Sequence, residues 1–233
     1  APTVTTLDLP PIGLGTSGNT EFEECAATVV RALEAGYRHV DTAQMYDNEA
    51  AVGEGLRRAD VPREDVVLAT KVRPESLGRE DALRTARESL DRLGVDAVDM
   101  LSVPCPTKAS QPVETLAAFD ALPRPGVARH VCVSNFTPAL LDEARDLLTA
   151  PVAAHQVECH PLLPQRELRA YARRHGHTVV GYSPLGRGDL VDHPVLAEIA
   201  ERHGVPTAAV PLAWARAVGV VPIPKGRGEH VEA

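Results

Sequence analysis

The chain has 233 residues, a length that suits one large domain or two small ones. A domain of this size buries most of the surface that its unfolded chain exposes, so it needs neither a disulfide nor a metal to hold it together. Acidic residues number 32 against 24 lysines and arginines, which gives a net charge of −8. Because nucleic-acid binding requires basic patches, this balance argues against a nucleic-acid partner.

The cysteines are widely spaced, and none forms a Cys-x-x-Cys pair. They are Cys25, Cys105, Cys132 and Cys159. This spacing predicts no structural zinc site, no other metal site and no disulfide framework. No apolar run approaches the roughly 18 residues that a membrane span needs, and the first residues lack the pattern of a signal peptide. The sequence therefore predicts a soluble, cytoplasmic protein, which we expect to be a monomer without a membrane partner.

Short apolar runs alternate with amphipathic segments along the whole chain. The predicted strands are residues 12–15, 39–41, 66–70, 98–103, 129–134, 153–157, 178–182 and 218–223. The predicted helices are residues 21–35, 49–59, 79–93, 112–122, 137–148 and 165–175, with two more within 194–217, separated at 204–206. Strands that alternate with helices imply a parallel sheet. Eight such units in this length predict one α/β domain over residues 1–233, a closed (β/α)₈ TIM barrel.

An open, doubly wound sheet is the alternative architecture. The glycine-rich segment from Gly13 to Gly18 superficially resembles the dinucleotide-binding turn of that fold. The eightfold repetition of strand and helix favours the barrel. Two features depart from a regular barrel. Pro211 falls inside the last predicted helical run, where we expect a kink. Only about ten residues follow the eighth strand, so we expect the barrel to lack its usual C-terminal helix and substrate loop.

Polar residues stand at the C-terminal ends of the predicted strands, where the active sites of βα barrels lie. They include Thr16, Asp41, Thr42, Thr70, Lys71, Ser134, Asn135, Gln156, Glu158, Tyr182, Ser183 and Lys225. A set of this kind converges on one rim of the barrel and predicts an active site there. Lysine is scarce in the chain, which makes its position informative. The lysines are Lys71, Lys108 and Lys225.

Asp41, Tyr46 and Lys71 together suggest acid–base chemistry. A free tyrosine is a poor acid at neutral pH, and a nearby ammonium stabilises its phenolate. An aspartate beside the lysine would hold the ammonium in place and keep it charged. This trio predicts a proton donor that works near neutral pH. Each residue alone has a simpler interpretation, because a strand-end aspartate often caps a helix and a tyrosine often only packs.

The chain resembles the aldo-keto reductases in six ordered motifs between about Ile12 and Lys225. The motifs are Asp41-Thr42-Ala43-Gln44-Met45-Tyr46-Asp47-Asn48-Glu49 with Gly53, Thr70-Lys71, Val133-Ser134-Asn135-Phe136, Gln156-Val157-Glu158-Cys159-His160-Pro161, Tyr182-Ser183-Pro184-Leu185-Gly186, and Ile223-Pro224-Lys225. The resemblance implies a (β/α)₈ barrel that reduces aldehydes or ketones to alcohols with a nicotinamide cofactor. NADPH is the expected cofactor, with NADH as the alternative.

The resemblance also implies roles for individual residues. Tyr46 would be the general acid, Lys71 would tune it and Asp41 would pair with Lys71. The nicotinamide would stack on Tyr182, and its carboxamide would be held by Ser134, Asn135 and Gln156. The remaining cofactor contacts would come from Thr16, Asp41, Ser183, Leu185, Gly186, Lys225 and Arg227. The substrate pocket would include Ser17, Tyr46, Pro104 and Cys105.

Pro104 departs from the family pattern, since it occupies the place of a catalytic histidine after the fourth strand. Proline has no donor, and the loss of such a group typically lowers a rate about 10²–10⁴-fold. His160 resembles part of a structural His-Pro turn, and not a replacement for the missing catalytic histidine. The segment after Lys225 also departs, because Arg227 is displaced, which leaves the choice between NADPH and NADH open.

Three interpretations follow from these departures. The first is a carbonyl reductase whose activity Pro104 would lower. The second is a nicotinamide-binding sensor or regulatory protein with little turnover. The third is a decaying sequence that folds poorly. The sequence does not indicate the physiological substrate.

Overall fold

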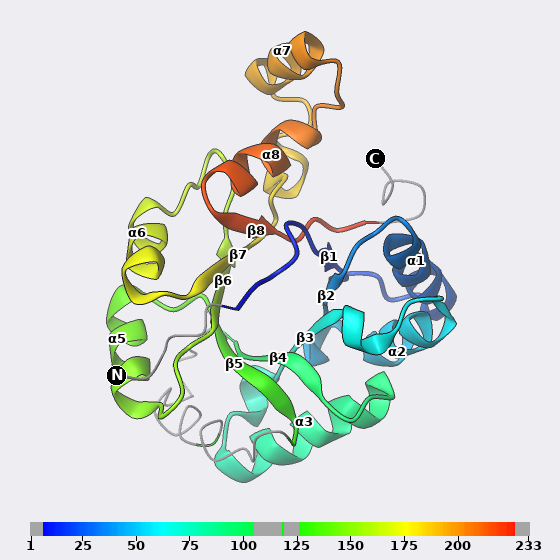
Figure 1. Cartoon of the computed structure of the whole chain (residues 1–233), viewed down its shortest axis with the longest axis vertical. Helices are drawn as coiled ribbons and strands as arrows, with labels where there is room; N and C mark the ends of the chain where they lie inside the picture. The colour runs from blue at the N-terminus through cyan, green and yellow to red at the C-terminus, as the bar shows by residue number, and fades with distance from the viewer. Residues whose placement is uncertain (1–6, 105–117, 119–125, 227–233) are drawn as a thin grey trace.

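The computed structural model describes residues 7–104, 118 and 126–226. One parallel sheet of eight strands runs in chain order (Figure 1). The strands are β1 (Leu14–Gly15), β2 (His39–Asp41), β3 (Val67–Lys71), β4 (Val98–Val103), β5 (Ala128–Ser134), β6 (Ala154–Glu158), β7 (Thr178–Tyr182) and β8 (Val220–Pro222). They match the predicted strands to within a few residues.

The sheet closes on itself between its first and last strands. The Gly13 N–H donates to the Pro222 carbonyl at 3.0 Å, and the Gly15 N–H donates to the Pro224 carbonyl at 2.8 Å. A Cβ at Gly15 would lie 2.8 Å from the Ile223 carbonyl oxygen, so glycine is needed for this close approach. The predicted barrel is therefore confirmed, and the open sheet is excluded. The glycines that resemble a dinucleotide turn serve to close the barrel.

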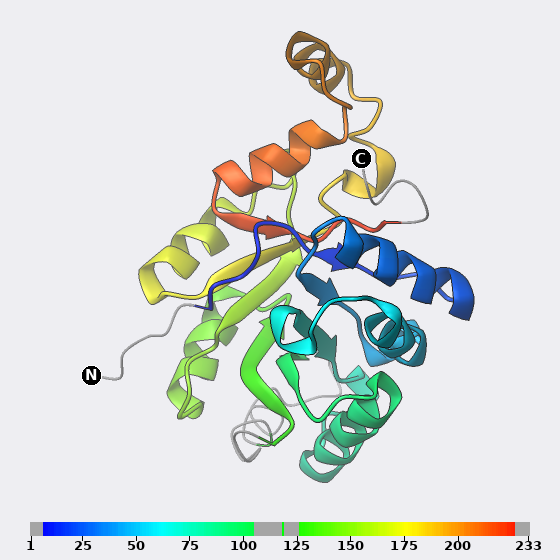
Figure 2. The ribbon, with the colours of Figure 1, turned by 45° about the vertical axis from the view of Figure 1, so that its right-hand side comes forward.

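Helices surround the barrel (Figure 1). They are α1 (Phe22–Glu34), α2 (Glu49–Arg58), α3 (Arg79–Leu93), α5 (Pro138–Leu147), α6 (Arg166–His175), α7 (Pro194–His203) and α8 (Ala209–Ala217). Figure 2 shows that α7 projects beyond α8, away from the strands. The predicted helix at 112–122 lies outside the described residues except for Ala118, which is helical and buried.

The expected kink at Pro211 is wrong. Helix α8 begins at Ala209, so Pro211 lies in its first turn. The first N–H groups of a helix have no partner within the helix, and a proline there removes no hydrogen bond. The prediction failed because it began the helix at Pro206, three residues too early.

Alternation of side chains along the strands divides the core into two layers. Outward-facing residues such as Val40, Leu68 and Leu101 pack beneath the helices. A second cluster, which includes Met100, Cys132 and Val180, fills the barrel interior. Leu7 and Leu9 pack against this inner cluster, and the Leu7 carbonyl accepts from the Thr178 hydroxyl at the start of β7. The N-terminal segment thus covers one end of the barrel and leaves the C-terminal ends of the strands open.

Candidate active site

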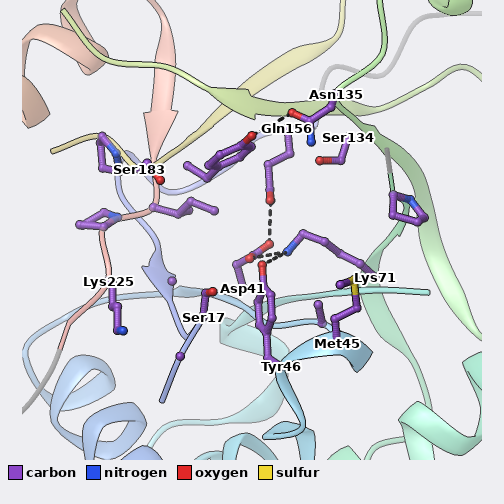
Figure 3. Close-up of a pocket in the computed structure, with 18 of the residues that line it drawn as sticks. Ser17, Asp41, Met45, Tyr46, Lys71, Ser134, Asn135, Gln156, Ser183 and Lys225 are labelled. Carbon is purple, nitrogen blue, oxygen red and sulfur yellow. Dashed lines mark hydrogen bonds and ion pairs between the residues drawn. The ribbon is translucent and has the colours of Figure 1, made fainter. Parts of the chain in front are cut away.

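Asp41, Tyr46 and Lys71 meet at the C-terminal end of the barrel (Figure 3). Asp41 ends β2, Lys71 ends β3, and Tyr46 ends a single 3-10 turn, Gln44–Tyr46, that follows β2. Lys71 Nζ lies 2.6 Å from Asp41 Oδ1 and 3.5 Å from Tyr46 Oη. Lys71 Nζ also donates to the Thr42 carbonyl at 3.1 Å. The structure therefore assembles the predicted trio, with the ammonium between the carboxylate and the phenol.

The charge on Lys71 is stabilised by its partners. Burial by itself lowers the pKa of the Lys71 ammonium, because a charge loses its hydration there. The negative charge of Asp41, together with contacts to Tyr46, outweighs burial and holds the pKa of Lys71 above its ordinary value. Lys71 is thus a fixed cation beside the Tyr46 hydroxyl at neutral pH.

Gln156 binds the second oxygen of the Asp41 carboxylate. Its side-chain nitrogen donates to Asp41 Oδ2 at 2.7 Å, from β6 on the other side of the barrel (Figure 3). Asp41 is almost fully buried, so both its oxygens accept hydrogen bonds inside the protein. The carboxylate therefore links β2, β3 and β6 at the floor of the site.

A cavity of about 840 Å³ opens above this floor. Its walls contain most of the residues that the sequence predicted for the site: Ser17, Asp41, Tyr46, Lys71, Pro104, Ser134, Asn135, Gln156, Tyr182, Ser183, Leu185 and Lys225. They come from loops after most of the strands, as expected for the catalytic end of a βα barrel. A cavity of this size holds a drug-sized or cofactor-sized molecule.

Asn135 and Tyr182 form a polar pair on the wall opposite Tyr46. The Tyr182 hydroxyl donates to Asn135 Oδ1 at 3.1 Å. Asn135 has a φ of 58°, a left-handed conformation that asparagine tolerates better than most residues. The bond to Tyr182 orients the amide so that its nitrogen can donate elsewhere. Ser134, Asn135 and Gln156 thus offer a polar surface suited to a carboxamide.

The loop after β7 forms a tight turn that carries a cation at the cavity wall. Leu185 has right-handed angles (φ −96°, ψ 14°), and Gly186 and Arg187 follow with a φ of 58° each. The N–H groups of Gly186, Gly188 and Asp189 donate to carbonyls within this loop, which holds it as a compact turn. Arg187 lines the same cavity, and Lys225 adds a cation at its far end (Figure 3). These features fit the diphosphate of a dinucleotide.

Some predicted site residues do not line the cavity. Thr16 is fully buried and donates to the Asp41 carbonyl at 2.9 Å, so it supports the floor from below. Gly186 shapes its loop but does not contribute to the wall. His160 forms a turn with Leu163 and does not line the cavity, in agreement with a structural His-Pro turn. Cys105 and Arg227 lie outside the described residues.

Several wall residues were missed from the sequence. Met45, Val72 and Pro74 line the side near Tyr46, and Arg187 lines the loop after β7. Met45 and Arg187 adjoin predicted residues in the chain and could have been found by extending those motifs. Val72 and Pro74 carry no reactive group, so no chemical signal marked them.

The described residues contain neither a metal-binding cluster nor a membrane-spanning helix. Within residues 7–104, 118 and 126–226, no group of three or more histidine, cysteine, aspartate or glutamate side chains is placed to hold a metal ion. In the same part of the chain, no helix is long and apolar enough to cross a membrane.

Comparison with known proteins identifies the family. The chain matches the model of the Aldo/keto reductase family over residues 11–231. The chain belongs to the aldo-keto reductase family. An aldo-keto reductase of Mycolicibacterium smegmatis is 39% identical over 218 residues, which cover 93% of this chain and 79% of the relative. The glyoxal reductase of Bacillus subtilis is 38% identical over 225 residues, which cover 96% of this chain and 81% of the relative.

Solved structures of aldo-keto reductases have the same fold. The enzyme from Brucella melitensis aligns with a TM-score of 0.87 at 34% identity, over 96% of this chain and 89% of that one. A thermostable aldo-keto reductase crystallised with the inhibitor epalrestat aligns with a TM-score of 0.90 at 36% identity, over 97% and 89%. Aldo-keto reductases are oxidoreductases that act on small carbonyl compounds and generally use NAD(P)H, and this chain is an oxidoreductase of that family.

Proposed function

We propose that this aldo-keto reductase reduces aldehydes or ketones to alcohols, with Tyr46 as the general acid and NADPH as the preferred cofactor. The observation that carries the proposal is the placement of Tyr46 Oη 3.5 Å from the buried ammonium of Lys71, at the floor of a large open cavity. A hydroxyl beside a fixed cation releases its proton more readily than a hydroxyl in water. That property suits protonation of a carbonyl oxygen as it gains negative charge.

Each part of the cofactor would contact a different group of cavity residues. Ser134, Asn135 and Gln156 would bind the carboxamide, and the Tyr182 ring would support the nicotinamide. The loop from Ser183 to Gly188 would bind the diphosphate, and Lys225 would bind the phosphate or ribose of the adenosine. When bound, the cofactor supplies the hydride. The chain itself positions the substrate carbonyl next to the Tyr46 hydroxyl and supplies the proton.

Asp41 and Lys71 would act through Tyr46. Asp41 Oδ1 keeps the Lys71 ammonium charged, and Lys71 stabilises the phenolate left after Tyr46 has given up its proton. Gln156 would have two tasks, since its amide also fixes Asp41 Oδ2. The substrate side of the cavity would be formed by Ser17, Tyr46 and Pro104. Among the relatives, the glyoxal reductase acts on a small dicarbonyl by its name, which supports a small and reactive carbonyl as substrate here.

A second candidate function rests on Pro104. This proline is buried at the cavity wall after β4, where it presents no hydrogen-bond donor. With a donor missing there, the chain would bind the nicotinamide cofactor and transfer hydride slowly, as a sensor or a regulatory protein does. The reductase remains the better supported function, because cofactor binding alone would not require the Tyr46 hydroxyl to lie beside the buried Lys71 ammonium.

Cofactor titration followed by a single turnover separates the two functions. NADPH and NADH are titrated by fluorescence, and the loaded protein is then mixed with an electron-poor aromatic aldehyde. We expect tighter binding of NADPH and loss of its 340 nm absorbance on mixing. Tight binding without hydride transfer to any aldehyde would instead support the sensor.

A further inference from the structure

Gln44 begins the single helical turn that carries Tyr46, yet its side chain points away from the cavity. Only 3% of its surface is exposed, and it does not line the cavity that holds Tyr46. It packs instead toward α3, on the outer side of the barrel. Gln44 and Tyr46 therefore lie on opposite sides of the same short turn.

Every polar group of the Gln44 side chain has a partner. Its nitrogen donates to the Thr85 carbonyl at 2.9 Å and to Ser89 Oγ at 2.9 Å, both on α3. Its oxygen accepts from the Arg73 N–H at 2.9 Å. One buried amide thus joins the Tyr46 turn to a helix and to the segment after β3. A buried polar group that is satisfied on both sides holds its neighbours in a single arrangement.

The Arg73 side chain also binds the backbone of the Tyr46 turn. Its guanidinium donates to the Gln44 carbonyl, at 2.8 Å from Nη2 and 3.2 Å from Nε, and it also pairs with Asp47 on the far side of the turn. Gln44 stands two residues before Tyr46, and Arg73 stands two residues after Lys71. The Gln44–Arg73 bonds therefore tie together the two segments that carry the phenol and the ammonium.

Besides the contacts of Gln44 and Arg73, the Tyr46 segment has a hydrogen bond between its two ends. The Thr42 hydroxyl donates to Asn48 Oδ1 at 2.7 Å, which fixes where the segment leaves β2 and enters α2. The turn between these ends holds itself through the Tyr46 N–H to the Ala43 carbonyl at 3.0 Å. Neither of these two contacts joins the turn to the segment after Lys71, whereas the Gln44 side chain does so through the Arg73 N–H.

We propose that Gln44 is a positioning residue that sets the distance between Tyr46 Oη and Lys71 Nζ. The inference rests on the proposed role of Tyr46. A separation of 3.5 Å is at the outer limit of a hydrogen bond, so a small tilt of the turn breaks it. Displacement of a reacting group by about 1 Å can lower a rate on the order of 10²-fold.

The Gln44→Met variant tests the proposal, since methionine fills a similar volume and makes none of the three hydrogen bonds. We expect kcat for aldehyde reduction to fall about 10–100-fold. We also expect the Kd for NADPH to stay within about twofold of the wild-type value. Thr85→Val is the matched control, because it removes a buried hydroxyl beside the same contacts. Among the residues that the structure describes, that hydroxyl bonds only to the Asp81 carbonyl. We expect its kcat to match the wild type.

A second readout does not depend on turnover. With tyrosine labelled at the ring carbon that bears the hydroxyl, the resonance of Tyr46 is recorded by NMR at pH 7 in the wild type and in the variant. In Gln44→Met that resonance should move away from its wild-type chemical shift, because the phenol loses its contact with the Lys71 ammonium. The two measurements together distinguish a failure of the proposed reductase function from a failure of the proposed role of Gln44. A wild-type chain that reduces no carbonyl overturns the proposed function, and an unmoved Tyr46 resonance overturns the role of Gln44.

The Gln44→Glu variant covers the case in which methionine prevents folding. Its carboxylate still accepts from the Arg73 N–H but faces the Thr85 carbonyl without a proton to donate. We expect reduced kcat at neutral pH, with recovery relative to the wild type as the pH falls and the carboxyl group becomes protonated. Activity equal to the wild type at every pH, in a folded variant, would overturn the proposal.

Discussion

At the scale of single residues, the site depends on one buried carboxylate with both oxygens in use. Asp41 accepts from Lys71 through one oxygen and from Gln156 through the other. A charge buried in this way is stable only while its partner is present. The arrangement explains why Lys71 remains charged although it is largely withdrawn from solvent.

Asp41→Asn should therefore destabilise the protein as well as the site. The amide offers one oxygen in place of two, and it leaves the Lys71 ammonium buried without a counter-charge. We expect a loss of about 3–5 kcal/mol in the free energy of unfolding, measured by urea denaturation. Asp47→Asn, which removes a largely exposed ion pair with Arg73, should cost less than about 1 kcal/mol. Equal losses in the two variants would contradict this account of Asp41.

Pro104 bears on substrate preference. Met45, Val72, Pro74 and Pro104 line the described wall near Tyr46 and carry no side-chain donor. A histidine at this position would add a donor for the carbonyl oxygen. We expect Pro104→His to raise kcat/KM for an unactivated aldehyde about 10²-fold, and to raise it less for a dicarbonyl that is already electrophilic. Steady-state rates with the two substrates check this, and no gain with either would contradict it.

At the scale of elements, the strands and most helices were predictable because each carries a local pattern. Strands show short apolar runs, and α3 shows charges on one side with apolar residues on the other. The start of α8 was missed because the position of a first turn depends on packing more than on local pattern. The role of Gln44 was not predictable either. Its partner Ser89 is 45 residues away in sequence, and no local pattern reports such a contact.

Gly53 provides a test of packing between elements. Helix propensity predicts that Gly53→Ala, within α2, stabilises the protein. The structure predicts the opposite, because the new Cβ would lie 2.3 Å from the Leu93 carbonyl at the end of α3. We expect a loss of about 1–3 kcal/mol in a urea unfolding experiment. Ala50→Gly, on the exposed side of the same helix, should cost about 1 kcal/mol from propensity alone. A stabilised Gly53→Ala protein would show that α2 and α3 are not packed as described.

At the scale of the whole molecule, the barrel contains buried neutral histidines. Burial lowers the pKa of His39 to about 4, of His155 to about 3 and of His177 to about 4. His155 also accepts from the Phe136 N–H at 3.1 Å, a bond that its protonation would break. In the unfolded chain each histidine titrates near 6.5. Between about pH 6.5 and 4 the unfolded chain therefore binds more protons than the folded protein.

Stability should accordingly fall as the pH falls through that range. Each of the three histidines contributes up to about 1.4 kcal/mol per pH unit, so together the slope approaches about 4 kcal/mol per pH unit near pH 5. Urea unfolding at pH 7, 6 and 5 measures the slope. His155→Gln retains an acceptor for Phe136 and should lower the slope by about a third. A stability that does not change between pH 7 and pH 5 would contradict the buried, neutral state of these residues.

The barrel and the convergence of Asp41, Tyr46 and Lys71 were both predictable from the sequence, and for the same reason. In a βα barrel all strands end at the same rim. Residues that directly follow successive strands in the sequence are therefore expected to lie close together in space. Asp41, Tyr46 and Lys71 meet as expected. The hydrogen bond from Gln156 to Asp41 crosses the barrel between β6 and β2. It was not predictable, because the sequence does not show which side chains meet across the barrel.

The role of Tyr46 as general acid is the central claim, and the Tyr46→Phe variant tests it most directly. Phenylalanine keeps the ring and removes the proton. With NADPH and an electron-poor aldehyde, we predict that kcat falls about 10²–10⁴-fold while the Kd for NADPH, measured by fluorescence titration, stays within about twofold. A Tyr46→Phe protein that reduces aldehydes as fast as the wild type would contradict the account.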